Sequence, residues 1–261
     1  MCRMMVLEEI KRINSNSFCS LSELLDITSG SIISVVGCGG KTSLIEHLAR
    51  CNLDKKVLVS PTAKMFPIIA NDITQCYTIE ESLHHTAHIG VQCFGQLNEK
   101  TNKLEALPDQ ILAELTLQYN IVLLEADGSR SLPFKGWRDN EPVVPIYSTH
   151  TIGVATLSAL RRPATEDNVH NLNEFLSLTG LKRGDTITEY AVEAMICSSQ
   201  GMFKNAVGAK YLIIPKVENE TEHQVARAFC ESLMRNYTKL FKSIVYGSIK
   251  NNVWYEVCRE Q

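Results

Sequence analysis

Ser31–Ala49 has the sequence SIISVVGCGGKTSLIEHLA. Its first half is rich in β-branched residues without alternating polar positions, which is typical of a strand buried on both faces of a parallel sheet. Its second half places Leu44, Ile45 and Leu48 at helical spacing, and a glycine-rich segment joins the two halves. Strand, glycine loop and helix in direct succession predict a phosphate-binding loop at the carboxyl end of a central strand.

The loop residues have the chemistry that phosphate binding needs. Glycines let the backbone turn so tightly that several N–H groups face one anion, and the helix that follows adds its positive N-terminal end. Lys41 would reach terminal phosphate oxygens, and the Thr42 hydroxyl would lie where a magnesium ligand is needed. The predicted nucleotide-binding residues are Gly37, Cys38, Gly39, Gly40, Lys41, Thr42 and Ser43. The alternative is a glycine turn between strand and helix that binds nothing.

The loop is a short form of the common phosphate-binding pattern. The full pattern has a glycine five positions before Gly40, where this chain has Val35, so the motif is G-x-x-G-K-T. In this motif alone, the chain resembles the P-loop of the Mur ligases and folylpolyglutamate synthetases. A small-molecule kinase or ligase is therefore one of the functions that the motif leaves open.

Composition argues against several classes of protein. The chain has 261 residues and a net charge of −3 with basic and acidic residues mixed throughout, so neither nucleic acid nor a membrane surface is expected as a partner. No apolar stretch approaches the roughly 18 residues of a membrane span, and acidic residues stand where a signal peptide has its apolar core. Nine cysteines without a CxxC pair suit free thiols in a reducing compartment. We expect a cytoplasmic protein without disulfides.

Another buried-strand run, Ile121–Leu124, leads directly to two carboxylates, Glu125 and Asp127. Such groups at the carboxyl end of a parallel strand suit a phosphate loop, because one of them can hold or orient the magnesium ion. Arg130 and Lys135 follow, and either could stabilise developing negative charge or simply face water. The predicted catalytic residues are Lys41, Glu125, Asp127 and Arg130, and the predicted metal ligands are Thr42, Glu125 and Asp127. The alternative is an Asp-Gly turn that only shapes the backbone.

Two further groups of polar residues are weaker candidates. The strand predicted at 56–59 ends near Thr62 and Lys64, which could contact a phosphate or metal-bound water, or could be solvated loop residues. His84 and His88 are one helical turn apart, as in some metal sites. Because the histidines have no paired acidic or cysteine partner, a surface helix is their favoured interpretation.

Strands and helices alternate along the chain without an internal repeat or a long linker. We therefore predict an α/β fold, a single P-loop-like domain over residues 1–261 with a mainly parallel sheet, flanking helices and the site at the carboxyl edge of the strands. Residues 1–28 are expected to form a helical lead-in that packs on the sheet. Residues 84–106 are expected to contain a small antiparallel extension.

Three segments, in this order and at this spacing, resemble the YqeC family: GCGGKTSL at 37–44, SPTAKMFP at 60–67 and LLEADGSRSLPFKGWRDNEPVVP at 123–145. The family is described as selenium-dependent hydroxylase accessory or selenium cofactor biosynthesis proteins. The resemblance covers nearly the whole chain. It implies a nucleotide-binding protein that acts in the maturation of selenium-dependent molybdenum hydroxylases, with such a hydroxylase or a cofactor donor as its partner.

Two positions depart from the family's pattern. Cys38 stands where the family usually has a small residue. A thiol beside a helix N-terminus and Lys41 would have a lowered pKa and could react with selenium or oxidants, but a small tolerated side chain is the favoured interpretation. Pro215-Lys216-Val217-Glu218 stands where the family tends to have Asn-Lys-x-Asp, the base-reading sequence of GTPases. The longer Glu218 and the missing Asn amide weaken the case for guanine.

The leading functional hypothesis is a Mg²⁺- and NTP-dependent enzyme or NTPase, with ATP favoured, GTP left open and an unidentified small-molecule second substrate. Lys41 would stabilise β/γ-phosphate charge, Thr42 and an acidic side chain would hold magnesium, and Arg130 or Lys135 would meet the second substrate. The alternative is a nucleotide-gated carrier or chaperone that docks on a hydroxylase or cofactor donor and makes no bond of its own.

Overall fold

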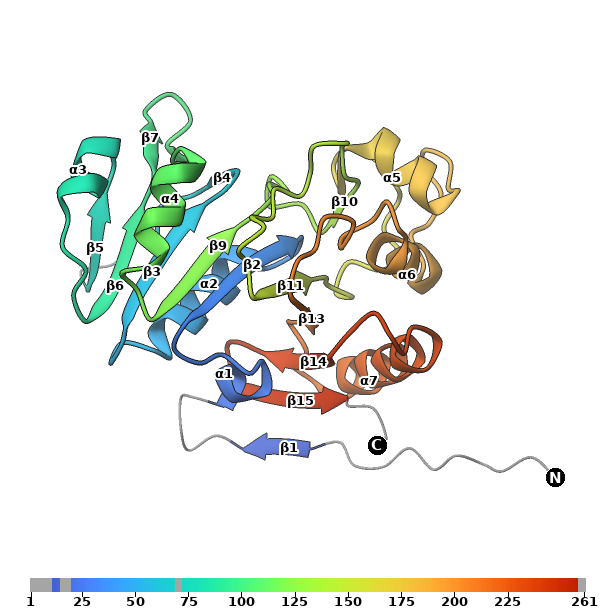
Figure 1. Ribbon diagram of the computed structural model, residues 1–261. Helices are drawn as coiled ribbons and strands as arrows, with labels where there is room; N and C mark the ends of the chain where they lie inside the picture. The colour runs from blue at the N-terminus through green and yellow to red at the C-terminus, as the bar shows by residue number, and fades with distance from the viewer. Residues whose placement is uncertain (1–10, 15–19, 69–71, 258–261) are drawn as a thin grey trace.

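The computed structural model describes residues 11–14, 20–68 and 72–257. Within these residues, one ten-stranded sheet has the order β1-β15-β14-β13-β11-β2-β9-β3-β6-β5 (Figure 1). Its strands are β1 Lys11–Asn14, β2 Ser31–Gly37, β3 Lys56–Pro61, β5 Ile73–Cys76, β6 Gly90–Phe94, β9 Ile121–Glu125, β11 His150–Val154, β13 Ala209–Ile214, β14 Ser243–Ser248 and β15 Val253–Val257. All strands from β14 to β5 run parallel, β15 pairs antiparallel with β14, and β1 pairs antiparallel with β15 and so runs in the direction of the parallel strands. The predicted α/β fold with a mainly parallel sheet is confirmed.

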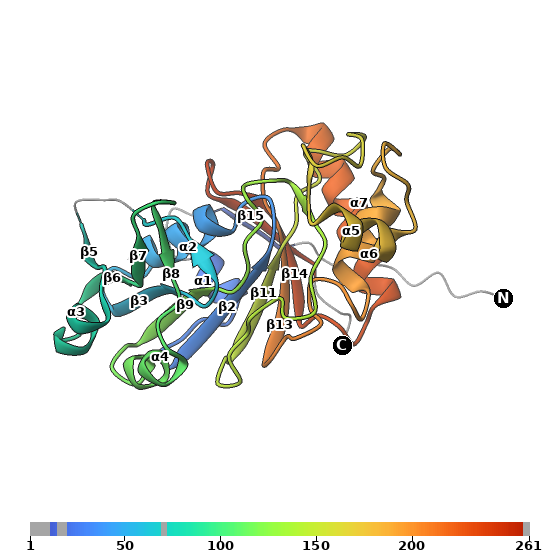
Figure 2. The same ribbon diagram turned by 90° about the horizontal axis from the view of Figure 1, so that it is seen from above.

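Helices cover both faces of this sheet, and Figure 2 shows α2 and α4 on opposite sides of it. The helices are α1 Ser20–Leu24, α2 Lys41–Arg50, α3 Ile79–His84, α4 Asp109–Thr116, α5 Leu172–Thr179, α6 Glu189–Cys197 and α7 Glu220–Asn236. Side chains of β9 alternate between the two faces: Leu123 packs in the same core cluster as Leu44 of α2, and Leu124 packs with Leu112 of α4. A third cluster lies under α5, α6 and α7. The central strands are therefore buried on both faces, as their uniformly apolar sequences predict.

A small antiparallel sheet stands beside the main one and consists of β4 Lys64–Met65, β8 Lys103–Glu105 and β7 Gln96–Asn98. This confirms the predicted antiparallel extension within 84–106. Strand β6, which also falls within 84–106, is not part of this extension, because it pairs in parallel with β3 and belongs to the main sheet. The small sheet places β4, which follows the carboxyl end of β3, next to the glycine loop.

The predicted helical lead-in over 1–28 is wrong at Lys11–Asn14, which forms strand β1. This strand pairs antiparallel with β15, whose outer edge would otherwise leave its backbone N–H and C=O groups unpaired. Such pairing outweighs the weak local preference for a helix. Helix α1 confirms the later part of the lead-in, while residues 1–10 and 15–19 lie outside the described residues.

The histidines of the weaker candidate site do not share a helix face. His84 is the last residue of α3, and His88 lies in the irregular segment beyond it. No group of three or more histidine, cysteine, aspartate or glutamate residues in the described part of the chain is arranged to hold a metal ion by itself. In the same residues, no helix combines the length and apolar character needed to cross a membrane.

Candidate functional site

The glycine loop lies directly against the end of β11. Gly37 and Gly39 have φ values of 103° and 82°, in the left-handed region that favours glycine. A Cβ atom on Gly37 would overlap the carbonyl oxygen of Val154, and one on Gly39 would lie 2.6 Å from Cγ2 of Thr156. No side chain caps α2 at Gly40, so the first N–H groups of this helix are left for a ligand or solvent.

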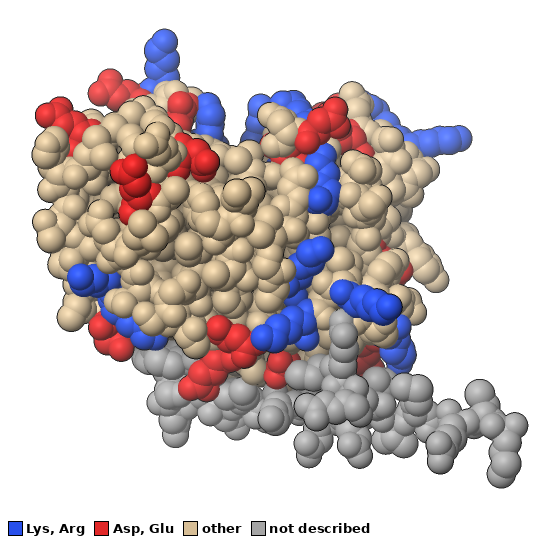
Figure 3. Space-filling model, in the orientation of Figure 1, with Lys and Arg blue, Asp and Glu red and all other residues tan. Residues whose placement is uncertain are grey.

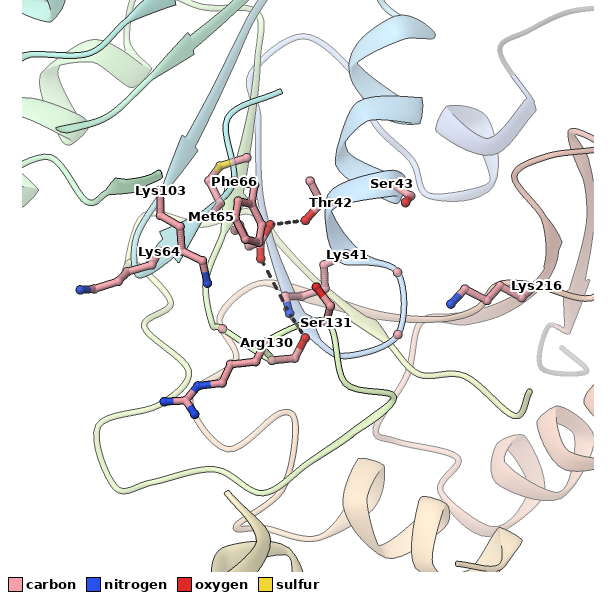
Figure 4. A pocket seen from close by; sticks show the side chains of 15 residues that line it. Lys41, Thr42, Ser43, Lys64, Met65, Phe66, Lys103, Arg130, Ser131 and Lys216 are labelled. Atoms are coloured by element: carbon pink, nitrogen blue, oxygen red, sulfur yellow. Dashed lines mark hydrogen bonds and ion pairs between the residues drawn. The ribbon is translucent and has the colours of Figure 1, made fainter. Parts of the chain in front are cut away.

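Lys41 begins α2 and is only 4% exposed. Its Nζ donates to the carbonyl oxygen of Gly37 at 2.7 Å, and lies 3.2 Å from Oδ1 of Asp127 and 3.9 Å from Oε1 of Glu125. Burial alone would lower the pKa of Lys41, but the two carboxylates outweigh burial and the pKa is raised. The strand end of β9 therefore keeps this ammonium charged and positioned beside the loop (Figure 4).

Asp127 lies beneath the loop and is completely buried. Its oxygens accept hydrogen bonds from the Gly37 N–H at 3.1 and 3.2 Å and from Nε1 of Trp137 at 2.6 Å, and Nζ of Lys135 is 3.5 Å away. Burial acts to raise the pKa of Asp127, but Lys41, Lys135 and these hydrogen bonds outweigh it and the pKa is lowered. Asp127 is thus an ionised positioning group that holds both Lys41 and the loop.

Glu125 is in a different situation, although it is only two residues away. It is 6% exposed and lines the pocket in front of the loop, where its Oε2 accepts a hydrogen bond from Oγ1 of Thr42 at 2.9 Å. Burial raises the pKa of Glu125, because the attraction of Lys41 and the Thr42 hydrogen bond do not fully compensate it. A partly compensated carboxylate beside a threonine hydroxyl is an arrangement that favours a divalent cation.

The pocket has a volume of about 240 Å³ and is lined by five cationic residues and a single carboxylate, that of Glu125. The cationic residues are Lys41, Lys64, Lys103, Arg130 and Lys216. Figure 3 shows a notch at the top of the molecule with Lys and Arg side chains on both of its sides, and Figure 4 shows Lys103 and Lys216 on opposite sides of the pocket. Such a concentration of positive charge in a concave site attracts a multiply charged anion.

The chain is similar to proteins of one known family. The family model described as YqeC protein matches residues 33–173, which is more than half of the chain. A protein of Escherichia coli strain K12 described as uncharacterized protein YqeC is 30% identical over 181 residues, covering 67% of this chain and 71% of that protein. The chain belongs to the YqeC family. The matched residues of the YqeC family model include the glycine loop, both carboxylates and Arg130, whereas Lys216 lies beyond them.

Most of the site residues predicted from the sequence come together in this YqeC-family protein. The pocket lining contains Gly39, Gly40, Lys41, Thr42, Ser43, Lys64, Glu125 and Arg130. Gly37 and Cys38, at the start of the loop, and Asp127, beneath it, are not part of the lining. Arg130 and the following Ser131 both have positive φ values, 51° and 61°, and they form one wall of the pocket.

Two predicted candidates have structural roles instead. The Thr62 hydroxyl donates to the carbonyl oxygen of Val143 at 2.6 Å and is not part of the pocket lining. Lys135 neither faces water nor lines the pocket, because its fully buried ammonium donates to the carbonyl oxygen of Gly128 at 2.6 Å and lies 3.2 Å from Oε2 of Glu141. These contacts fix the segment that follows β9.

The predicted lowering of the Cys38 pKa is wrong. The thiol is completely buried and donates to the carbonyl oxygen of Pro133 at 3.0 Å. Burial raises the pKa of Cys38 to about 12, because exclusion of water outweighs the attraction of Lys41. The small tolerated side chain is the correct alternative, and the thiol has no thiolate character with which to react.

Sequence reasoning missed several residues that shape the site. Lys103 begins β8 and Phe66 follows β4, and the pairing of these two strands brings both side chains into the pocket lining, with Nζ of Lys103 4.6 Å from the centre of the Phe66 ring. Trp137 supplies an indole N–H to Asp127. The only sequence signal for Trp137 was its place in the block that resembles the YqeC family, and Lys103 carried no signal without the hairpin register.

Proposed function

We propose that this YqeC-family protein binds a magnesium–nucleoside triphosphate complex in the cation-lined pocket and hydrolyses it or transfers its terminal group. The observation that carries the proposal is the meeting of Lys41, Thr42 and Glu125 at the uncapped N-terminus of α2. The loop N–H groups and Lys41 would hold the β- and γ-phosphates. Asp127 supports them by fixing Lys41 and the Gly37 N–H.

The residues present fit a magnesium ion. Magnesium in phosphate-binding sites keeps several waters and takes one or two protein ligands, so a cluster of three acidic or histidine ligands is not required. Thr42 and Glu125 would hold it, and the raised pKa of Glu125 is what an adjacent cation would relieve. When bound, magnesium supplies neutralisation of phosphate charge. Arg130, which makes no ion pair with the other described residues, would balance charge on the terminal phosphate.

The cellular part of the proposal comes from the family resemblance. We propose that the nucleotide cycle serves the maturation of selenium-dependent molybdenum hydroxylases in the cytoplasm, with a hydroxylase or a cofactor donor as the partner protein. A small-molecule second substrate would then enter the notch in front of Arg130 and Phe66, since both line the pocket and are exposed. The support for this role is membership of the YqeC family.

Calorimetric titration of ATP, GTP and CTP, each with and without magnesium, tests the proposal. We expect Lys41→Ala to weaken binding about 10- to 100-fold, because a charge-assisted contact to phosphate is worth about 1.5–3 kcal/mol. Lys239→Ala, at an exposed lysine outside the pocket lining, is the matched control. Circular dichroism verifies that both variants fold.

Thr42→Val provides a second variant that leaves the buried ion pairs intact. We expect it to abolish most of the gain in affinity that magnesium gives the wild type, and to leave magnesium-free binding unchanged. Absence of magnesium-dependent binding of any of the three nucleotides to the wild type, or unchanged affinity in folded Lys41→Ala, would contradict the proposal.

A further inference from the structure

A second cavity adjoins the phosphate pocket, and Arg130 lines both of them. It has a volume of about 330 Å³ and lies between the segment that follows β9 and residues 166–174, which lead into α5. Figure 4 shows the Arg130 side chain extending away from Lys41. One arginine is therefore shared by the candidate phosphate site and a further space that is large enough for a small molecule.

The two walls of the second cavity are held together by backbone contacts. Strand β10 Phe134–Lys135 pairs in parallel with β12 Val169–His170, and the N–H of Gly136 donates to the carbonyl oxygen of His170 at 2.9 Å. A Cβ on Gly136 would overlap the backbone nitrogen of Phe175, so α5 approaches this segment as closely as a glycine allows. The cavity is thus a fixed part of the fold, which favours binding because little ordering is required.

The charges that line the second cavity do not all cancel. Arg183 is held by Glu166, whose two carboxylate oxygens lie 2.5 and 2.7 Å from its guanidinium nitrogens. Arg138 is 64% exposed, and Nε lies 3.9 Å from Oε1 of Glu174, which is too far for a hydrogen bond. Arg130 is exposed and forms no ion pair with any other described residue. Two guanidinium groups are therefore available to an anion.

His170 lines the same cavity and adds no charge that would compete for the anion or repel a cation. The pKa of His170 is lowered to about 4, chiefly by burial and next by the positive charge of Lys135. Arg130 and Arg138 act in the same direction, and Glu141 opposes them. The imidazole is therefore neutral at pH 7 and offers one donor and one acceptor. Its lowered pKa agrees with a positive field in the cavity.

We propose that the second cavity binds the second substrate of the nucleotide-dependent reaction, and that this substrate is a small molecule with a phosphate or carboxylate group. The inference rests on the proposed function, since it names the substrate class of that same reaction. Arg130 and Arg138 hold the oxyanion, because the guanidinium fork matches both kinds of group. His170 and the exposed amide of Asn173 bind uncharged polar groups. Because Arg130 also lines the phosphate pocket, the rest of the molecule extends past it toward the terminal phosphate.

Orthophosphate and malonate are the probes for the two kinds of oxyanion. Each is titrated into protein saturated with magnesium and the non-hydrolysable ATP analogue AMP-PNP, which fills the phosphate pocket, and broadening of its phosphorus or carbon NMR signal measures binding. We expect at least one probe to bind the wild type, and the difference between the two identifies the oxyanion. Calorimetry measures the binding of AMP-PNP separately.

Arg138 lines the second cavity and not the phosphate pocket, so Arg138→Ala should weaken the probe about tenfold and leave AMP-PNP unchanged. Arg130→Ala should weaken both, because Arg130 lines both cavities. Arg227→Ala is the matched control, at an exposed arginine that is paired with Glu231 outside both cavities, and it should change neither. Circular dichroism verifies that the variants fold.

The inference is wrong if neither probe binds the AMP-PNP-saturated wild type, although the proposed function would then stand. It is also wrong if Arg138→Ala binds the probe as tightly as Arg227→Ala does, or if Arg130→Ala weakens only one of the two ligands. Failure of AMP-PNP to bind the wild type would refute the proposed function, and the site of a second substrate with it.

Discussion

Asp127→Asn removes the carboxylate that joins two buried lysines. The oxygens of Asp127 lie 3.2 Å from Nζ of Lys41 and 3.5 Å from Nζ of Lys135, and no part of the side chain reaches solvent. Removing one partner of a buried ion pair leaves an uncompensated buried charge, which costs about 3–5 kcal/mol. Glu125 and Glu141 remain near the two lysines, so we expect a loss at the lower end of this range in the free energy of unfolding.

Glu125→Gln is the matched variant, and we expect it to behave differently. Glu125 is 3.9 Å from Lys41, and its firm contact is the hydrogen bond from Thr42, which a glutamine oxygen can still accept. Because burial already disfavours the charged form of Glu125, its neutral replacement should change the free energy of unfolding by less than about 1 kcal/mol. Two carboxylates separated by one residue should therefore differ clearly in their effect on stability.

Urea denaturation at pH 7, followed by tryptophan fluorescence and circular dichroism, measures both variants. Asp54→Asn, at an exposed aspartate, is the surface control. A loss below about 1 kcal/mol in Asp127→Asn, or equal losses in Asp127→Asn and Glu125→Gln, would refute the division between a positioning carboxylate and a ligand-facing one.

The dependence on pH has opposite signs at the two carboxylates. The pKa of Asp127 is lowered by folding, so its stabilisation is present above the unfolded value near 3.9 and is lost as the pH falls through the folded pKa. The difference between wild type and Asp127→Asn should therefore shrink in acid. The pKa of Glu125 is raised, so wild type should lose stability relative to Glu125→Gln as the pH rises through that folded pKa.

Two further predictions concern the loop. Gly37→Ala should lower the free energy of unfolding by more than about 2 kcal/mol, because its Cβ would overlap the Val154 carbonyl oxygen. Gly30→Ala, with φ 90° and no atom within 4 Å of its Cβ, should lower it only by the roughly 1–2 kcal/mol that a left-handed alanine costs. Urea denaturation of both variants compares the two losses. Cys38, with a pKa of about 12 and no exposed surface, should resist iodoacetamide at pH 8 in the native protein and react in urea, as mass spectrometry of its peptide can show.

The sequence was most informative where a segment is buried on both faces. The run at 31–36 and the one at Ile121–Leu124 have no polar alternation, and both became central parallel strands. Lys11–Asn14 could not be predicted in the same way, because its structure depends on the free edge of β15, which is formed near the other end of the chain. A strand that is held only by backbone pairing leaves no periodic signal in its own residues.

Within the site, too, some features could be predicted from the sequence and others could not. Lys41, Thr42 and Glu125 could be placed together because β2 and β9 are parallel neighbours, with Val35 opposite Glu125 in the register. The exposure of Cys38 and Lys135 could not be predicted, since it depends on the segment after β9 passing behind the loop. Reactivity and charge state follow from that burial, so only the structure decides between a reactive thiol and a small tolerated side chain at Cys38.

The segment that most strongly resembled the YqeC family acts mainly as a support. Asp127, Lys135, Trp137 and Glu141 all belong to it, and they form one connected buried network in which Asp127 contacts the lysine and the indole, and Lys135 contacts Glu141. The network ends on Lys41, the residue at the centre of the proposed phosphate site. A buried charge network is costly unless each member is paired, so these residues depend on one another for stability. The buried part of the block therefore holds one lysine in place, while Glu125 and Arg130 of the same block line the pocket.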